Sequence, residues 1–183
     1  MKRLAIITVG KTHSGKTTFA KTLEQNLPNS VVIDQDNHAE FINTYYRKLL
    51  SQDGPNTLKS AISQNIVNYA VNETNYHLIL CNANRNRVGR MMLLNRLHQD
   101  GFFTVIVYFD IPDSVLNSRI AISQRSKAIF RSASSFEEVL YRQQAESQND
   151  DMSPPAENEA DRLFVIKDGS QINSIIDEIC RPR

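Results

Sequence analysis

The 183-residue chain has little cysteine, no tryptophan and almost no net charge. Its two cysteines, Cys81 and Cys180, lack the C-x-x-C spacing of thiolate metal sites, and so few cysteines do not form a disulfide scaffold. We interpret Cys81, which closes an apolar run, as a buried thiol at the end of a strand. Cysteine usage of this kind is typical of a reducing compartment, and we expect a cytoplasmic protein.

The balance of charge excludes a broad class of partners. The chain carries 21 lysines and arginines against 20 acidic residues, a formal net charge of +1. Such a chain has no general electrostatic attraction to nucleic acid or to a membrane surface. Nucleic acid is therefore a weaker candidate partner than a small molecule, because it would need a local basic cleft.

Long hydrophobic runs are also missing. A membrane-spanning helix needs about 20 apolar residues in succession, and no segment approaches that length. The run Leu4–Val9 follows two basic residues but leads straight into Gly10, with no small-residue cleavage site. We therefore expect neither a signal peptide nor a membrane partner.

Five short apolar runs are present and predict five strands. They are nearly continuous in apolar character and rich in β-branched residues, as strands are when a sheet is covered on both faces. The runs are Leu4–Val9, Val31–Asp34, His77–Asn82, Phe103–Phe109 and Leu163–Lys167. Helical stripes lie between them. Helices are expected to start at Pro112-Asp113, with Asp113 as the capping residue, and at Ser135, with Ser135 and Glu138 forming a capping box. This alternation predicts an α/β fold with a parallel sheet and helices on both faces, as a single domain over residues 1–183.

A segment of unusual charge precedes the last predicted strand. Residues 143–161 contain six acidic residues and no basic one, and they follow a stretch that contains several arginines. One interpretation is a helical lid or insert at about residues 119–161. A solvated helix and loop is the other, and the charge pattern alone does not separate the two.

A glycine-rich motif follows the first predicted strand directly. The glycines let the backbone wrap around phosphate oxygens, while loop amides and the start of the next helix direct partial positive charge at the anion. The stripe Phe19, Leu23 and Leu27 indicates that this next helix is present. The motif matches G-x-x-x-x-G-K-[ST] at every fixed position and reads Gly10-Lys11-Thr12-His13-Ser14-Gly15-Lys16-Thr17. Together with Thr18, these residues are the predicted nucleotide-binding loop.

Two side chains of the loop have expected chemical roles. Lys16 is placed to reach the outer phosphates of a nucleotide, and the Thr17 hydroxyl is placed to bind Mg²⁺. ATP and Mg²⁺ are accordingly the expected cofactors.

Carboxylates follow the second predicted strand. Ligands of parallel sheets lie beyond the carboxyl ends of the strands, so this position is informative. Asp36 is the preferred candidate to accept a proton from an acceptor hydroxyl, or to hold Mg²⁺ through water. Asp34, in strand register, could equally be a structural carboxylate near the first helix. We interpret His38 as an exposed or capping residue rather than a substrate ligand.

Several segments together resemble a known group of enzymes. The loop, Gln35-Asp36 and Ile79–Arg85 are similar to the P-loop kinases of the polynucleotide-kinase-like and zeta-toxin-like group, which have a nucleoside-monophosphate-kinase-like fold. The run Phe109–Asp113, followed by Arg119 and Arg125, strengthens the resemblance. It extends from residue 4 to about residue 167, and Gln35-Asp36 is also similar to the same element of nucleoside-type kinases.

The resemblance implies a three-layer P-loop fold with five parallel strands in the order 2-3-1-4-5 and a helical lid. It also implies transfer of the ATP γ-phosphoryl group to a hydroxyl. By position, Asp36 matches the aspartate that activates the acceptor in this group. Arg119 and Arg125 match the lid arginines, which stabilise charge on the transferring group. Arg131 is interpreted as part of a surface salt bridge.

The sequence departs from the group at two positions. Asn82 stands where the group often has an aspartate, and its amide cannot supply charge to Mg²⁺. Ala39 falls near a phosphate-holding arginine of polynucleotide kinases, which makes a polynucleotide 5′-hydroxyl a weaker candidate acceptor. One interpretation of Arg85, Arg87 and Arg90 is that they bind a substrate anion. The other is that they lie on a solvated face of a helix.

The leading hypothesis is therefore an ATP-dependent kinase for a small hydroxyl-bearing molecule. A nucleoside, a sugar derivative and an antibiotic all fit. A P-loop protein that binds ATP without kinase activity is the rival, and Asn82 keeps it open. A nucleotide switch is disfavoured because the guanine-reading Asn-Lys-x-Asp motif and an ABC-type signature are missing from the sequence.

Overall fold

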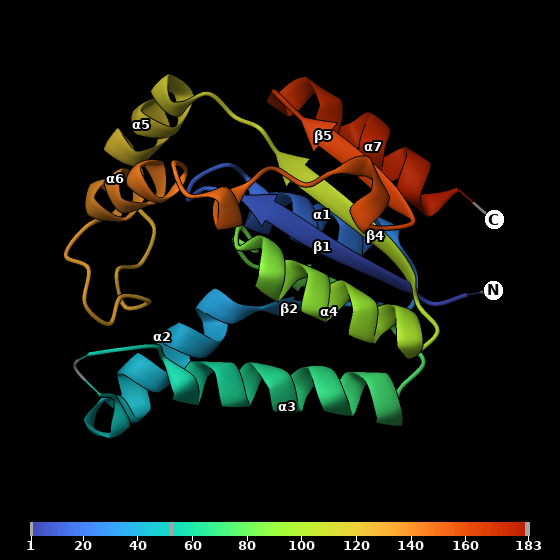
Figure 1. Ribbon diagram of the computed structural model, residues 1–183, viewed down its shortest axis with the longest axis horizontal. Helices are drawn as coiled ribbons and strands as arrows, with labels where there is room; N and C mark the ends of the chain where they lie inside the picture. Colours follow the sequence, from blue (N-terminus) through green and yellow to red (C-terminus); the bar gives the residue numbers. More distant parts are fainter. Residues whose placement is uncertain (1, 52, 182–183) are drawn as a thin grey trace.

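Five parallel strands form the middle layer of the computed structural model, which describes residues 2–51 and 53–181. The strands lie in the order β2-β3-β1-β4-β5, so the first strand of the chain is central (Figure 1). They are β1 (Leu4–Gly10), β2 (Ser30–Asp34), β3 (His77–Cys81), β4 (Phe103–Phe109) and β5 (Arg162–Ile166). The order confirms the prediction, and each strand boundary lies within one residue of the predicted boundary.

Helices cover both faces of this sheet. The α-helices are α1 (Lys16–Asn26), α2 (Gln35–Tyr45), α3 (Thr57–Glu73), α4 (Arg87–Gln99), α5 (Asp113–Ala121), α6 (Phe136–Glu146) and α7 (Ile172–Cys180). Short 3-10 turns are η1 (Arg47–Leu49), η2 (Asp150–Met152), η3 (Glu157–Glu159) and η4 (Gly169–Gln171). α1 and α7 pack on one face, and α3 and α4 pack on the other (Figure 1).

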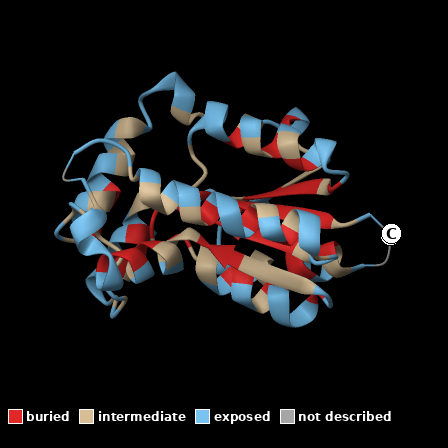
Figure 2. Ribbon diagram, turned by 90° about the horizontal axis from the view of Figure 1, so that it is seen from below, coloured by how far each residue is buried: buried red, intermediate tan, exposed pale blue. Residues whose placement is uncertain are grey.

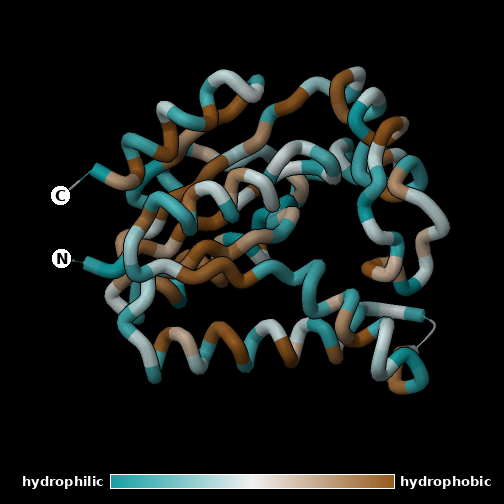
Figure 3. Tube along the Cα trace, turned by 180° about the vertical axis from the view of Figure 1, so that it is seen from behind, coloured by the Kyte–Doolittle hydropathy of each residue, from teal (hydrophilic) through white to brown (hydrophobic). Residues whose placement is uncertain are grey.

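The apolar strands supply the core on both sides. Every residue of β1 is buried, and successive side chains point to opposite faces. Ile6 packs in the cluster that contains Phe19 of α1, whereas Ile7 packs in the cluster that contains Leu94 of α4. Buried residues lie in the strands and on the inner sides of the helices (Figure 2), and hydrophobic residues gather along the same segments (Figure 3).

Two groups of helices flank the carboxyl ends of the strands, at the end of the molecule away from both termini (Figure 1). One group contains α2 and the start of α3, and the other contains α5 and α6. The sequence had not predicted α2, because residues 37–56 lack a helical stripe. α2 buries only Ala39, Ile42 and Asn43, so its apolar face is too narrow to show in the pattern.

The predicted helix starts are confirmed in position and corrected in detail. α5 begins at Asp113, but the Asp113 side chain does not cap it and instead pairs with Lys11 at 2.6 Å. Ser135 caps α6 by accepting from the Glu138 amide at 3.2 Å. The Glu138 carboxylate accepts from the Ser134 amide and so does not complete the expected capping box. Across residues 2–51 and 53–181, every helix falls short of the length and hydrophobicity that a bilayer span requires.

Candidate active site

A cavity of about 570 Å³ lies at the carboxyl ends of the strands. The glycine-rich loop, the ends of β2 and β3, and α5, α6 and their connection (residues 122–135) contribute to its walls. The predicted residues that line it are Thr12, His13, Ser14, Gly15, Lys16, Thr17, Thr18, Asp36, Arg119 and Arg125. Gly10 and Lys11, the other two predicted loop residues, line a separate cavity beside it.

The two glycines of the loop are required by its backbone. Gly10 has φ of 151°, and a Cβ there would lie 3.0 Å from Cβ of Phe109 and 3.1 Å from Oγ of Ser14. Gly15 has φ of 102° and forms the N-cap of α1. A side chain at either position would strain the turn or push the loop away from β4. Loop residues 12–15 and the start of α1 thus line the cavity, as an anion site requires.

Lys16 lies inside this loop. Its Nζ donates hydrogen bonds to the carbonyl oxygen of Lys11 at 2.5 Å and to Oγ of Ser14 at 3.1 Å. Burial lowers the pKa of Lys16 from 10.5 to about 8, although the nearby Asp36 carboxylate opposes this shift. Lys16 is therefore charged at neutral pH and begins to lose its charge only slightly above it.

Thr17 faces a carboxylate, but it is Asp34 rather than the predicted metal ligand Asp36. Thr17 Oγ1 donates to Oδ2 of Asp34 at 3.2 Å, and Sγ of Cys81 lies 3.7 Å from the same hydroxyl. Asp34 is only 5% exposed, and its Oδ1 also caps α2 by accepting from the Asp36 amide at 2.9 Å. Sequence reasoning had treated Asp34 as a possible structural residue, and it proves to be the buried carboxylate at the loop.

The Thr17–Asp34 pair fits a magnesium ion chemically. Mg²⁺ prefers oxygen ligands and usually takes one or two carboxylates together with substrate phosphates. Cys81 is a poor competitor for such a hard cation, because burial raises the pKa of its thiol to about 11 and keeps it neutral. Asn82 lines the same cavity beyond Cys81.

Asp36 lies across the cavity and contacts Arg125. The Asp36 Oδ2 atom accepts a charge-assisted hydrogen bond from Nη2 of Arg125, a residue of the α5–α6 connection. Arg119 of α5 donates from Nη1 to the carbonyl oxygen of His13 at 3.0 Å. The four predicted catalytic residues, Lys16 included, therefore converge from distant parts of the chain.

Further polar contacts join residues 35–56 to the α5–α6 connection. Asn43 Nδ2 donates to the carbonyl oxygen of Ala128 at 2.7 Å, and Ser126 Oγ donates to Oε1 of Glu40 at 3.0 Å. Arg131 donates to the carbonyl oxygens of Ser51 and Gly54. Arg131 was expected in a salt bridge, and this expectation is wrong because its partners are backbone oxygens.

Two residues of the site were missed by sequence reasoning. The Thr12 amide of the loop donates to Oε1 of Gln143 at 2.7 Å, and Arg142 lines the cavity beside it. Arg142 lies in the basic stretch that preceded the acidic segment, which was a usable signal. Nothing in the sequence distinguished Gln143 from the glutamines around it.

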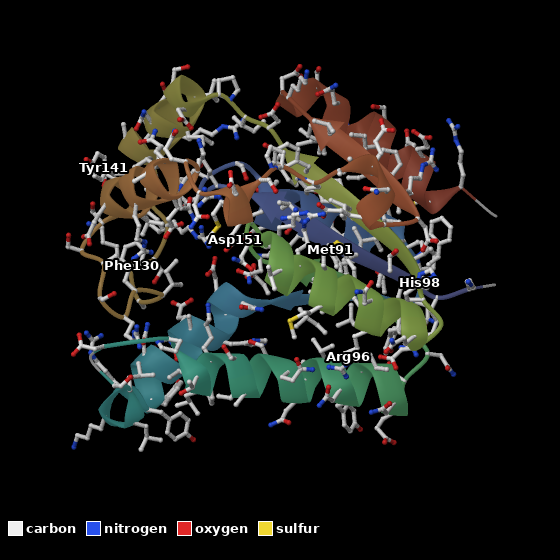
Figure 4. The ribbon with its side chains drawn as sticks, in the orientation of Figure 1. Met91, Arg96, His98, Phe130, Tyr141 and Asp151 are labelled. Carbon is white, nitrogen blue, oxygen red and sulfur yellow. The ribbon has the colours of Figure 1, made fainter. Side chains whose placement is uncertain are left out.

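His13 is packed rather than free in the loop. Its backbone has φ of 57°, its Nε2 lies 2.8 Å from Oγ of Ser123, and its ring meets Phe136 edge-on at 4.6 Å. Burial and the nearby Arg125 and Lys16 charges lower the pKa of His13, so it is neutral at physiological pH. It joins the loop to α6 through packing. Phe130 of the α5–α6 connection lies near this contact, whereas Tyr141 projects outward from α6 (Figure 4).

The arginines that follow β3 hold the acidic segment in place. Arg90 is buried, and its Nε donates to Oε2 of Glu159 at 2.6 Å while Nη2 donates to Oε1 at 3.0 Å. Arg87 lies 3.5 Å from the same carboxylate, and Arg85 pairs with Glu146 at 3.0 Å. These arginines were considered as substrate ligands, and the structure instead assigns them to protein contacts.

Comparison with known proteins places this site in context. A family model described as an AAA domain matches residues 6–149. No curated protein sequence is significantly similar to the chain.

Solved structures share the fold at low sequence identity. Shikimate kinase from Bacteroides thetaiotaomicron is 19% identical, with a TM-score of 0.58 over 96% of each chain. APS kinase from Mycobacterium tuberculosis, solved with AMPPNP and APS, is 15% identical, with a TM-score of 0.59 over 98% of this chain and 99% of that one. Kti12 from Chaetomium thermophilum, solved with ADP-AlF3, is 15% identical, with a TM-score of 0.63 over 96% of each chain. Identities this low show a shared fold alone.

Proposed function

We propose that this chain, which belongs to the AAA domain family, is an ATP-dependent kinase. Its reaction would phosphorylate a hydroxyl of a small molecule. The observation that carries the proposal is the arrangement around one cavity of Lys16, Asp36, Arg119 and Arg125. A nucleotide-binding protein without an acceptor has no use for a carboxylate opposite the loop. The two free cysteines fit the cytoplasmic setting in which ATP is available.

The loop side of the cavity is assigned to ATP. The amides of the loop and the start of α1 would bind the phosphates, and Lys16 and Arg119 would contact the outermost one. Thr17 and Asp34 would hold Mg²⁺, which supplies positive charge to the phosphate oxygens when bound. The nucleotides bound to APS kinase and Kti12 support this assignment.

Asp36 is assigned the role of general base. The acceptor oxygen forms a bond to the γ-phosphorus, the bond from that phosphorus to the bridging oxygen of ADP breaks, and the hydroxyl proton passes to the Asp36 carboxylate. Arg119 and Arg125 stabilise the charge on the transferring group. Arg125 already contacts Asp36, which supports a meeting point of the acceptor and the γ-phosphoryl group beside this pair.

The insert would act as a lid over this site. α5, α6 and their connection carry Arg119, Arg125 and Arg142, whereas the later part of the segment is attached to the body by the buried Glu159. α6 is also attached to the body, because Gln143 accepts from the Thr12 amide and Glu146 pairs with Arg85. We therefore assign the moving part to residues 119–135, a shorter segment than residues 119–161.

The decisive experiment measures ADP formation in the presence and absence of hydroxyl acceptors. The panel contains free sugars, sugar acids, nucleosides, nucleoside monophosphates and an oligonucleotide with a 5′-hydroxyl, and ³¹P NMR identifies the product. Acceptor-dependent ADP formation with a phosphate ester as product is the expected result. ATP binding without acceptor-dependent turnover in any arm would favour the rival function, a nucleotide-binding protein in which Asn82 replaces a catalytic carboxylate.

The buried Lys16 makes ATP binding sensitive to alkaline pH. Because its folded-state pKa is lowered to about 8, the free protein loses this charge as the pH rises above that value. ATP binding must then take up a proton, and affinity is expected to fall by up to about tenfold per pH unit. Calorimetry in two buffers of different ionisation enthalpy should show little proton uptake at pH 7 and close to one proton at pH 9. Equal proton uptake at pH 7 and pH 9 would contradict the assignment.

A further inference from the structure

A second, smaller cavity opens beside the main one, at the carboxyl ends of β2 and β3 and against α3 and α4. Its volume is about 160 Å³, and it shares Cys81 and Asn82 with the main cavity. The two spaces therefore meet beside Thr17, which contacts Cys81. A molecule in the second cavity would lie next to the place where phosphoryl transfer is proposed to occur. We call this space the acceptor cavity.

The acceptor cavity is lined by neutral polar groups. Its polar side chains are Gln35, Ser60, Ser63, Gln64, Asn82 and Asn84. Among its lining residues, all of which the structure describes, there is no lysine, arginine, aspartate or glutamate. An anion placed here would lose its hydration without gaining an ionic partner, which is costly.

Contacts outside the cavity fix three of these side chains. Gln64 Nε2 donates to Oδ1 of Asn68 at 2.7 Å, and Asn84 Nδ2 donates to the carbonyl oxygen of Thr8 at 2.9 Å. Ser63 Oγ lies 2.7 Å from Nδ1 of His38. The contacts of Gln64 and Asn84 each engage one of the two N–H groups of the side-chain amide, so one N–H and the carbonyl oxygen of each side chain are left for a ligand. A hydroxyl group can pair with both, because it donates one hydrogen bond and accepts others.

A further contact holds the α3 side of the acceptor cavity. Arg96 of α4 donates to Oδ1 of Asn68 at 2.5 Å, the same atom that accepts from Gln64. Arg96 lies between α4 and α3 (Figure 4). The position of Gln64 is therefore tied to both helices and does not depend on a ligand.

Apolar side chains form the rest of the wall. Ile33, Val67, Leu80 and Leu93 line the acceptor cavity, and they suit the carbon face of a ring. The volume is below the roughly 300 Å³ at which cavities for drug-sized ligands begin, so a sugar or a nucleoside fits better than an extended molecule.

We infer that the acceptor of this protein is a neutral, polyhydroxylated ring molecule, which lies in the acceptor cavity with its hydroxyls on the oxygens of Gln64 and Asn84. This inference rests on the proposed kinase function and deepens it. A free sugar and a nucleoside share the required chemistry. A carboxylated or phosphorylated acceptor is excluded from this cavity and would have to use Lys59, which lines the main cavity instead.

Matched acceptor pairs test the inference. Glucose is compared with glucuronate, and uridine with uridine 3′-monophosphate, at saturating ATP, so that the members of each pair differ in charge. The neutral member of at least one pair is expected to have a kcat/KM at least about tenfold higher than its anionic partner, equivalent to about 1.4 kcal/mol. The pair that responds distinguishes a sugar from a nucleoside. A preference for the anionic member in either pair would overturn the inference while leaving the kinase function intact.

The second part of the test is a variant that places a charge in the acceptor cavity. Gln64→Lys is expected to lower the neutral-to-anionic ratio at least about tenfold without changing KM for ATP. Asn65→Lys adds the same charge at the next residue of α3, which is exposed as Gln64 is but does not line the cavity, and it should leave the ratio unchanged. Equal ratios in the two variants would overturn the inference.

Binding separates failure of this inference from failure of the proposed function. Calorimetric titration of glucose and uridine into the protein with ADP reports on the cavity without turnover. If no acceptor is phosphorylated but a neutral molecule binds, and Gln64→Lys weakens its binding, the inference stands for a ligand and the kinase function fails. If neither neutral molecule is bound or phosphorylated, the inference fails.

Discussion

Replacement of Asp36 by asparagine is expected to preserve ATP affinity and to lower kcat for acceptor phosphorylation by about 10²- to 10⁴-fold. The asparagine has nearly the same shape but cannot take up the hydroxyl proton. ATP binding should survive because Asp36 lies opposite the loop, and Asp34 is the carboxylate in contact with Thr17. Steady-state kinetics with an acceptor found in the panel experiment, together with calorimetry for ATP, measures both quantities.

The contact with Arg125 requires a control, because Asp36 could act only by holding that arginine. A double-mutant cycle separates the two roles. If Asp36 receives the proton, Asp36→Asn should still lower kcat by at least about tenfold in an Arg125→Ala background. If Asp36 only positions Arg125, the second substitution should have no further effect, and the base assignment would be wrong.

Lys16→Ala is the comparison on the ATP side. It removes the charge that lies within the loop and should abolish nucleotide binding or turnover, whichever acceptor is present. The pair of variants therefore assigns the two sides of the cavity separately. Asp36→Asn is expected to affect transfer alone, and Lys16→Ala is expected to affect the nucleotide.

The largest expected effect on stability comes from Arg90, which lies outside the catalytic cavity. Arg90→Met should lower the free energy of unfolding by about 3–5 kcal/mol, because it leaves the Glu159 carboxylate buried without its partner. The side chains of Arg90 and Glu159 are 0% and 2% exposed. Burial by itself raises the pKa of Glu159, but the hydrogen bonds from Arg90 and the Ala156 amide, together with the Arg90 and Arg87 charges, hold the pKa below its ordinary value. Urea denaturation monitored by circular dichroism measures the change.

Two further variants identify the mechanism of this loss. Arg87→Met removes an arginine that lies 3.5 Å from the same carboxylate but is 56% exposed, and it should cost less than about 1 kcal/mol. Arg90→Met combined with Glu159→Leu should recover most of the lost stability, since no unpaired charge is then buried. A double variant as unstable as Arg90→Met would show that packing, and not the unpaired charge, is responsible.

The strands and the loop could be predicted because their signals are local. Each strand is a short apolar run, because helices cover both faces of a parallel sheet and bury the side chains on each face. The loop is specified by glycines whose backbone angles and close approach to Phe109 admit no side chain. Such constraints act on neighbouring residues, so the sequence displays them.

The rest of the site could not be predicted in this way, because it depends on contacts between distant residues. Asp34 and Thr17 are 17 positions apart, and Thr12 and Gln143 are 131 apart. In the sequence, Arg90 is one of several arginines in a helical segment. It is buried in the fold because Glu159, 69 residues later, packs against it. The charge of the acidic segment was visible in the sequence, whereas its attachment to α4 was not.

The contacts between residues 35–56 and the α5–α6 connection have a consequence for how specificity can change. The loop is built on the sheet and α1, so its geometry is tied to the core. The opposite side is joined by a few partly exposed polar contacts, and bonds of that kind contribute little to global stability. Substitutions there can alter which acceptor is accepted without loosening the nucleotide-binding half. New substrates can therefore be acquired on one side of the molecule while the other side keeps the same chemistry.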